Sequence, residues 1–317
     1  VVYKRQSCYL GKSAGVDSAS EKKTSSGSGG AIYAYTRTYV DIDGSTFSAN
    51  KAFDEKYGGG AVYLSNAKDP TITNCTFSAN SSVYNGGAVS AYSGTNLTVD
   101  TCTFDGNTST NNGGAVYASK SEVNIIDSDF TANASNSTKY GGGAVYFTAT
   151  TANVSGCKFT GNTSNLSGGA LSMYSDSEVT VEDTLFENNE AKVSTGDAGG
   201  GAMYISGGNA TLRNVQFKNN TSGRNGGAFC AYSKSNVNVY DVTADSNSAN
   251  YRGGAIYIGS SGTVVSIYGG EATSNTAKNN GNTIYCGGSS TLNIKTDAFT
   301  YEAGSIKGTI NEITDAK

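Results

Sequence analysis

The sequence predicts an all-β fold, a right-handed single-stranded parallel β-helix of about ten coils. Its 317 residues contain the triplet Gly-Gly-Ala nine times, at intervals of 26 to 32 residues. The triplets begin at Gly29, Gly59, Gly86, Gly113, Gly142, Gly168, Gly200, Gly226 and Gly253, and a degenerate tenth copy begins at Gly281. Repeats of this length cannot bury an apolar face alone, so we expect them to stack as coils of one solenoid.

A first strand is expected directly after each Gly pair. Two positions, two residues apart, are apolar in every copy, and this period is typical of a strand with one buried face. The first of these positions holds Ile32, Val62, Val89, Val116, Val145, Leu171, Met203, Phe229, Ile256 and Ile284. Stacking of the coils requires Val62, Val89 and Val116 to be direct neighbours along the axis.

A second strand is expected further along each repeat, five residues before a recurrent aromatic position. Its inward residues are mostly β-branched, which strands prefer. They are Ile42, Ile72, Val99, Ile125, Val154, Val181, Leu212, Val239, Ile267 and Ile294. Strands that pair with their copies in the next repeat are parallel, and parallel crossovers are right-handed.

The aromatic position belongs to a second motif, Phe-x-x-Asn. It reads Phe47…Asn50, Phe77…Asn80, Phe104…Asn107, Phe130…Asn133, Phe159…Asn162, Phe186…Asn189 and Phe217…Asn220. Ala244…Asn247 and Ala272…Asn275 keep only the Asn, and Phe299 keeps only the Phe. We expect the Asn to hold a turn and to form a ladder through the coils. The Gly pair suits a tight corner.

The chain length between this Asn and the next Gly pair varies, so we expect the surface loops at that corner. Residues 29–299 are predicted to form the β-helix. Residues 1–28 and 300–317 are predicted to be caps or extensions, because the end coils of a solenoid otherwise expose core and strand edges.

Composition excludes several classes of function. The net charge is −4 without a basic stripe, which argues against a nucleic-acid partner. No apolar stretch reaches 18 residues, so no membrane insertion is expected. The chain has no His and no Cys-x-x-Cys pair, and we therefore expect no metal site and no cofactor.

Catalysis is not predicted either. Without His, a Ser-His-Asp or Cys-His arrangement cannot form. Glycoside hydrolysis requires two carboxylates close together. The densest acidic region comprises Glu178, Glu182, Asp183, Glu187 and Glu190, and we interpret it as a solvated face.

Tyrosine recurs on the outward side of the first strand in every coil. The ten residues are Tyr33, Tyr63, Tyr92, Tyr117, Tyr146, Tyr174, Tyr204, Tyr232, Tyr257 and Tyr285. One interpretation is stacking that shields the sheet. The other is an exposed aromatic strip that binds sugar rings or a neighbouring protein.

Five Asn-x-Ser/Thr sequons outside the Asn ladder are candidate glycosylation sites. Their acceptors are Asn96, Asn136, Asn153, Asn165 and Asn209.

Two cysteines are expected to be neighbours in the core. Cys75 and Cys102 occupy the same inward register two residues before the Phe position. Adjacent strands place the Cα atoms about 4.8 Å apart, which brings a disulfide within reach. A ladder of buried thiols is the alternative.

The pairing of Gly-Gly-Ala-[Ile/Leu/Val] with Phe-x-x-Asn resembles the repeats of chlamydial polymorphic outer-membrane proteins. The resemblance covers residues 29 to about 300. Those proteins are autotransporter-type adhesins with a parallel β-helix passenger. The resemblance therefore implies a β-helix displayed at a surface, with adhesion as a further expectation.

Taken together, these features predict a secreted or cell-surface structural repeat protein that is not an enzyme. We expect it to associate with itself into a fibre or layer through end-to-end and lateral packing. The alternative is an adhesin or carbohydrate-binding module that uses the tyrosines, with glycans attached or bound. A polysaccharide-processing enzyme is a minor alternative.

Overall fold

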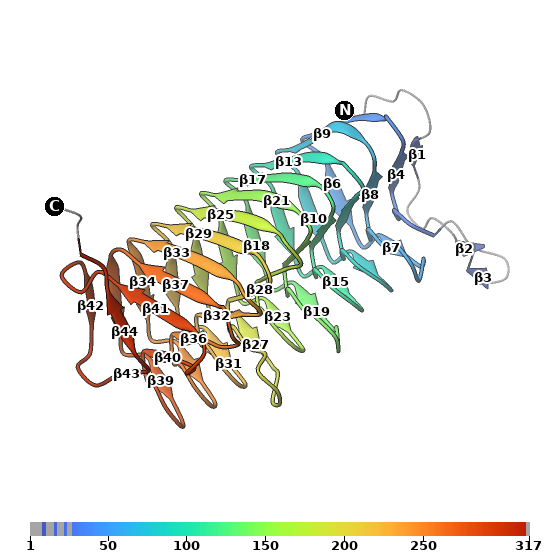
Figure 1. Ribbon diagram of the computed structural model, residues 1–317. Coiled ribbons are helices and arrows are strands. Elements are labelled where there is room, and N and C mark those ends of the chain that lie inside the picture. Colours follow the sequence, from blue (N-terminus) through green and yellow to red (C-terminus); the bar gives the residue numbers. More distant parts are fainter. Residues whose placement is uncertain (1–7, 11–15, 18–21, 24–26, 315–317) are drawn as a thin grey trace.

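The computed structural model describes residues 8–10, 16–17, 22–23 and 27–314, which form strands and turns without a helix. The strands stack into a rod of successive coils (Figure 1). We number the coils 1 to 10 from the Gly pairs at Gly29 to Gly281. The predicted all-β parallel solenoid is confirmed. A complete coil contains four strands, whereas the sequence pattern indicates two.

The first strand of each coil belongs to a 12-stranded sheet, here called the GGA sheet. Its members are β1 (Cys8–Leu10), β4 (Ile32–Tyr35), β8 (Val62–Ser65), β12 (Val89–Tyr92), β16 (Val116–Ser119), β20 (Val145–Thr148), β24 (Leu171–Tyr174), β28 (Met203–Ser206), β32 (Phe229–Tyr232), β36 (Ile256–Ile258), β40 (Ile284–Cys286) and β43 (Ile306–Lys307). Val89 is in register with both Val62 and Val116, which confirms the expected stacking.

The second strand belongs to an 11-stranded sheet, here called the long-strand sheet. Its members are β5 (Tyr39–Asp43), β9 (Lys68–Thr73), β13 (Asn96–Asp100), β17 (Glu122–Ile126), β21 (Thr151–Ser155), β25 (Glu178–Glu182), β29 (Asn209–Arg213), β33 (Asn236–Tyr240), β37 (Val264–Ile267), β41 (Thr291–Ile294) and β44 (Ile310–Glu312).

The third strand carries the Phe position and belongs to the 10-stranded Phe sheet. Its members are β6 (Thr46–Ser48), β10 (Thr76–Ser78), β14 (Thr103–Asp105), β18 (Asp129–Thr131), β22 (Lys158–Thr160), β26 (Leu185–Glu187), β30 (Gln216–Lys218), β34 (Val242–Asp245), β38 (Gly270–Thr273) and β42 (Phe299–Tyr301).

The fourth strand has two residues and belongs to the 9-stranded two-residue sheet. Its members are β7 (Lys51–Ala52), β11 (Ser81–Ser82), β15 (Thr108–Ser109), β19 (Ala134–Ser135), β23 (Thr163–Ser164), β27 (Glu190–Ala191), β31 (Thr221–Ser222), β35 (Ser248–Ala249) and β39 (Thr276–Ala277). Two further short strands, β2 (Val16–Asp17) and β3 (Lys22–Lys23), pair with each other.

Aromatic rings stack through the core of the Phe sheet. From Phe47 to Phe217, neighbouring ring centroids lie 4.7 to 5.2 Å apart, the spacing of the strands themselves. The assignment of Phe299 to this ladder is wrong. Tyr301 lies in register with Ala272, whereas Phe299 lies in register with Gly270, because β42 pairs two residues further along than the motif suggests.

The predicted Asn ladder is confirmed, and each buried member joins three coils. Asn162 shows the pattern: its Nδ2 donates to the carbonyl oxygen of Phe130 at 2.9 Å and to Oδ1 of Asn189 at 3.0 Å. Its own Oδ1 accepts from the backbone N–H and from Nδ2 of Asn133. The same contact between successive side chains links Asn50 to Asn275 without a break.

The two ends of the rod differ. Strand β1 pairs antiparallel with β4 and so covers that edge of the GGA sheet. The rest of the region predicted as an N-terminal cap lies largely outside the described residues. At the other end β43 and β44 pair in parallel with β40 and β41, so residues beyond Phe299 continue the coil.

Candidate binding surfaces

The ten outward tyrosines form a column on the GGA sheet, here called the tyrosine column. From Tyr33 to Tyr204, consecutive ring centroids lie 5.0 to 5.6 Å apart. In coil 8, Cys230 occupies the register position between Tyr204 and Tyr257. The tyrosines thus stack on each other, as in the first interpretation of the sequence.

The prediction of an exposed strip is wrong for half of the column. The side chains of Tyr63, Tyr117, Tyr146, Tyr204 and Tyr257 are only 2 to 8% exposed. The other five, Tyr33, Tyr92, Tyr174, Tyr232 and Tyr285, are half-buried. Burial raises the pKa of Tyr117 to about 12 and also raises the pKa of Tyr63 and Tyr146. The column therefore offers no continuous flat surface to a ligand.

Loops from the corner between the two-residue sheet and the GGA sheet cover the column. Tyr57, in the loop of coil 1, packs edge-on against Tyr63 and Tyr92 at 5.8 Å. Tyr140, in the loop of coil 4, packs against Tyr146 at 6.1 Å and Tyr174 at 5.0 Å. Variable loops were predicted at this corner, but their fold onto the tyrosines was not.

A third glycine marks each of these loops. Coils 1, 4 and 6 span 30, 29 and 32 residues, and in them Gly58, Gly141 and Gly199 precede the Gly pair. A Cβ atom at any of the three would lie 1.9 Å from a backbone oxygen of the next coil. Only glycine permits this approach. The Gly-Gly-Gly-Ala sequence is thus a signal for a covering loop.

The loop of coil 6 places a carboxylate on the column. Tyr232 donates its hydroxyl to Oδ2 of Asp197 at 3.3 Å, and Tyr257 donates to Oδ1 at 3.5 Å. Burial, followed by the negative charge of Asp197, raises the pKa of Tyr257 and of Tyr232. Cys230 lies fully buried beneath this loop.

Cys75 and Cys102 are buried free thiols, so the structure contains the thiol ladder and no disulfide between them. The two cysteines are in register on adjacent coils, because the residues that follow them, Thr76 and Thr103, are paired. Each thiol donates to backbone carbonyl oxygens, Cys75 to Thr73 at 3.0 Å and Cys102 to Asp100 at 3.2 Å. A hydrogen bond between the two thiols lowers the pKa of Cys75 and raises that of Cys102.

Four of the five candidate glycosylation sites are exposed. They are Asn96, Asn136, Asn165 and Asn209, whereas Asn153 is half-buried in the long-strand sheet. The sequon asparagines of the ladder, such as Asn80 and Asn162, are fully buried. An attached glycan is therefore compatible with the folded chain at the four exposed positions.

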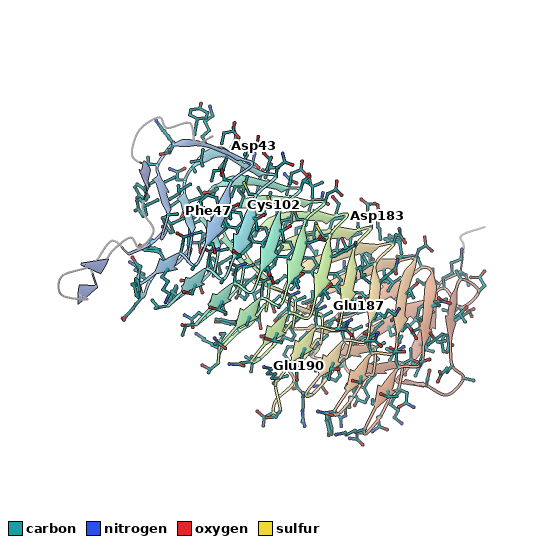
Figure 2. The ribbon with its side chains drawn as sticks, turned by 180° about the vertical axis from the view of Figure 1, so that it is seen from behind. Asp43, Phe47, Cys102, Asp183, Glu187 and Glu190 are labelled. Atoms are coloured by element: carbon teal, nitrogen blue, oxygen red, sulfur yellow. The ribbon has the colours of Figure 1, made fainter. Side chains whose placement is uncertain are left out.

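The acidic residues of coil 6 do not converge. Glu182 lies in the long-strand sheet, Glu187 in the Phe sheet and Glu190 in the two-residue sheet. Figure 2 shows Asp183, Glu187 and Glu190 at separate places around the rod. Asp183 accepts a hydrogen bond from Asn214 at 2.6 Å. Among the described residues, no cluster of three or more His, Cys, Asp or Glu side chains is placed to hold a metal ion.

A groove that the sequence did not predict follows the corner between the GGA sheet and the long-strand sheet. It consists of two hollows of about 490 and 440 Å³ that meet at Gly94, and we call it the corner groove. Its lining residues include Arg37, Tyr39, Asn66, Lys68, Asp69, Asn96, Lys120 and Glu122. It extends over coils 1 to 5, about 19 Å along the axis at 4.8 Å per coil.

A smaller hollow of about 280 Å³ lies on the two-residue sheet. Phe53 in coil 1 and Asn136 in coil 4 lie at its two ends, and Ser81 and Thr108 of the short-looped coils 2 and 3 line it between them. The longer loops of coils 1 and 4 thus bound the hollow, and the short loops of coils 2 and 3 lie between them.

Comparison with known proteins agrees with this geometry. The family described as "Right handed beta helix region" matches residues 13–186 and 143–309. No curated protein matches the chain. None of the described residues belongs to a helix long and apolar enough to cross a membrane.

Proposed function

Because the chain belongs to the right-handed β-helix family, we propose that it is a structural repeat protein of a cell surface or extracellular layer, without catalytic activity. The observation that carries this proposal is the continuity of its ladders. Hydrogen-bonded Asn side chains link coils 1 to 9, and Phe rings stack through coils 1 to 7. The strands of each coil pair with those of the adjacent coils, and loops reach further, as Asp197 of coil 6 does to Tyr257 of coil 9. This stacking makes an extended and stiff element.

The surface location rests on the resemblance to chlamydial polymorphic outer-membrane proteins. Their repeats combine the same two motifs, and their β-helices are displayed outside the cell. The exposed sequons are compatible with such a location. The separation of Asp183, Glu187 and Glu190 supports a role other than glycoside hydrolysis, which requires paired carboxylates.

Self-association is the second part of the proposal. Strand β6 is the last member of the Phe sheet at one end, and β42 is the last member at the other. Edge strands of this kind offer unpaired backbone groups to another chain. The long-strand sheet adds a lateral face with short polar side chains in register on consecutive coils, namely Thr98, Asn124, Asn153 and Thr180.

Sedimentation over a range of concentrations, followed by electron microscopy, tests the proposal. We expect filaments or sheets whose long axis follows the β-helix axis. Thr46→Lys on edge strand β6 should shorten filaments, because a lysine on an edge opposes strand addition. Thr76→Lys is the matched control, since Thr76 is exposed in the same column one coil inside. Single rods of about 45–50 Å at every concentration would contradict self-association.

A further inference from the structure

The corner groove combines cationic, aromatic and amide groups along one line. Arg37 lies in coil 1, Lys68 in coil 2 and Lys120 in coil 4, and all three line the groove. Asp69 and Glu122 are its two acidic members. The five charges give the groove a net charge of +1, whereas the whole chain carries −4. The sign of the groove's charge is thus opposite to that of the chain as a whole, which favours an anionic ligand there.

Tyr39 supplies an aromatic surface at one end of the groove. Its side chain is 49% exposed, unlike the buried tyrosines of the column. The Lys68 ammonium lies 5.1 Å from the centroid of the Tyr39 ring. A partly exposed ring beside a cation can pack against the apolar face of a sugar while the cation meets an acidic substituent.

The groove also contains two amide side chains and a glycine that leaves room for a ligand. Asn66 and Asn96 line it, and the Asn96 amide donates to Oδ1 of Asp69 at 3.1 Å. The Asp69 carboxylate therefore already accepts a hydrogen bond within the groove. At Gly94, where the hollows join, a Cβ atom would meet nothing within 4 Å. Gly94 lines both hollows and places no side chain between them.

The corner owes its shape to left-handed backbone. Arg37, Asn66 and Lys120 have φ values of 54°, 51° and 51°. Non-glycine residues rarely adopt this conformation. Asn66 and Lys120 occupy the same step of their coils, and Arg37 lies one residue beyond that step in coil 1. Because the coils repeat about every 4.8 Å, the groove presents polar groups at regular intervals to an extended chain.

We propose that the corner groove binds an acidic polysaccharide, with Arg37, Lys68 and Lys120 contacting its carboxylate or sulfate groups and Tyr39 packing against a sugar ring. This site is distinct from the tyrosine column and independent of self-association. Guanidinium and ammonium groups are the protein donors that bind such anions most strongly. The length of the groove favours an oligosaccharide over a single sugar.

Calorimetric titration with acidic oligosaccharides tests the proposal. The protein is produced in bacteria without N-linked glycans, so that Asn96 is unmodified. A heparin hexasaccharide and an oligogalacturonate serve as sulfated and carboxylated probes, and maltohexaose serves as the neutral probe. We expect binding of at least one acidic probe, weakened by added salt, and no comparable binding of maltohexaose. No binding of either acidic probe, or equal binding of maltohexaose, would overturn the proposal.

Substitutions separate the groove from general charge attraction. Arg37→Ala and Lys68→Ala should each weaken binding by roughly tenfold, as expected for loss of a charge-assisted contact. Tyr39→Ala should weaken it as well, whereas Tyr39→Phe should retain it within about twofold because the ring remains. Lys234→Ala is the matched control: Lys234 has the same left-handed conformation, with φ of 61°, but lies in coil 8 outside the groove. Equal weakening by Lys234→Ala would refute a specific site. Circular dichroism confirms that each variant is folded.

Discussion

Phe229 of the GGA sheet supplies the aromatic neighbour of Phe217 in coil 8, where the Phe position holds Ala244. Ala244 lies in register with Phe217, at the position where the Phe ladder would continue. Phe229 comes from the GGA sheet, where its neighbours in register are Met203 and Ile256. Its ring centroid lies 5.9 Å from that of Phe217, so the aromatic contact continues from the other side of the coil.

This exchange predicts energetic coupling between the two positions. Phe229→Val should destabilise the rod by about 1–3 kcal/mol because it leaves a cavity. Ala244→Phe alone should cost about 1–3 kcal/mol through overpacking. The double variant should return to within about 1 kcal/mol of the parent protein. Urea unfolding of all four proteins measures the coupling, and simple additivity would show that the two side chains do not share one space.

The Asn ladder predicts a large cost for removing one amide from its middle. Asn162→Ala removes the amide that donates to the carbonyl oxygen of Phe130 and the oxygen that accepts from the backbone N–H of Asn133. Oδ1 of Asn189 keeps the backbone N–H of Asn162, and Nδ2 of Asn133 keeps the carbonyl oxygen of Phe104. We expect a loss of about 2–4 kcal/mol in the free energy of unfolding, because the orphaned groups are buried. Asn165→Ala, at an exposed position three residues away, is the control and should change stability by less than about 0.5 kcal/mol. Similar effects of both substitutions would contradict the ladder as a stabilising element.

The buried thiols predict a slow reaction with thiol reagents. The experiment uses a Cys8→Ser background, which leaves the five buried cysteines Cys75, Cys102, Cys157, Cys230 and Cys286. None should react with Ellman's reagent while the rod is folded, since all five are buried and out of the reagent's reach. Burial also raises the pKa of Cys157 to about 12, whereas Cys75, whose pKa is lowered, is protected by its burial alone. In denaturant without reductant, all five should react. Only three reactive thiols after unfolding would reveal a disulfide between Cys75 and Cys102.

The tyrosine column predicts loss of stability at alkaline pH. In unfolded chains tyrosine has a pKa near 10, whereas burial raises that of Tyr117 to about 12. The unfolded state therefore loses its proton first. The stabilisation is fully present below about pH 10 and is lost as the pH rises toward 12.

Urea midpoints between about pH 8 and pH 11 measure this effect, together with tyrosinate absorbance. The midpoint should fall with pH, and Tyr117→Phe should make the fall less steep. Tyr35→Phe, at a side chain that is 52% exposed, should leave the slope unchanged. A midpoint that does not fall over this range would show that the buried phenols titrate as they do in the unfolded chain.

The third glycine of the covering loops predicts a steric limit. In Gly141→Ala the new Cβ would lie 1.9 Å from the carbonyl oxygen of Ser167, so backbone must shift. We expect a loss of about 2–4 kcal/mol and altered fluorescence of the tyrosines beneath the loop. Gly288→Ala is the control, because a Cβ there would meet nothing within 4 Å. A Gly141→Ala protein as stable as the control would mean that the loop base is not packed as described.

Much of the fold could be predicted from the sequence because stacking forces equivalent side chains to repeat. The strands after each Gly pair and the Asn ladder follow from such repetition. The Phe strand and the two-residue strand could not be predicted in this way. Phe77 and Ser82 are the single buried residues of β10 and β11, so these strands show no alternation of apolar and polar residues. The register of β42 was missed for the same reason.

The binding surfaces were harder to predict because they depend on parts that do not repeat. Tyr63 has the outward register of an exposed residue, yet Tyr57 of a long loop covers it. The corner groove depends on the absence of a side chain at Gly94 and on the turns at Arg37 and Lys120. The alternation of apolar and polar residues along the strands gives no information about these turns.

The common register of all coils has a consequence for the evolution of the chain. Residues 86–112 form one whole coil, and their removal would bring Val62 next to Val116 and Asn80 next to Asn133. The core strands and the Asn ladder would stay in register at the new junction, although Tyr57 would lose its contact with Tyr92. The rod would lose about 4.8 Å of reach. Gain or loss of whole repeats in the gene can therefore tune the distance this protein spans while the register of the core strands and of the Asn ladder is kept.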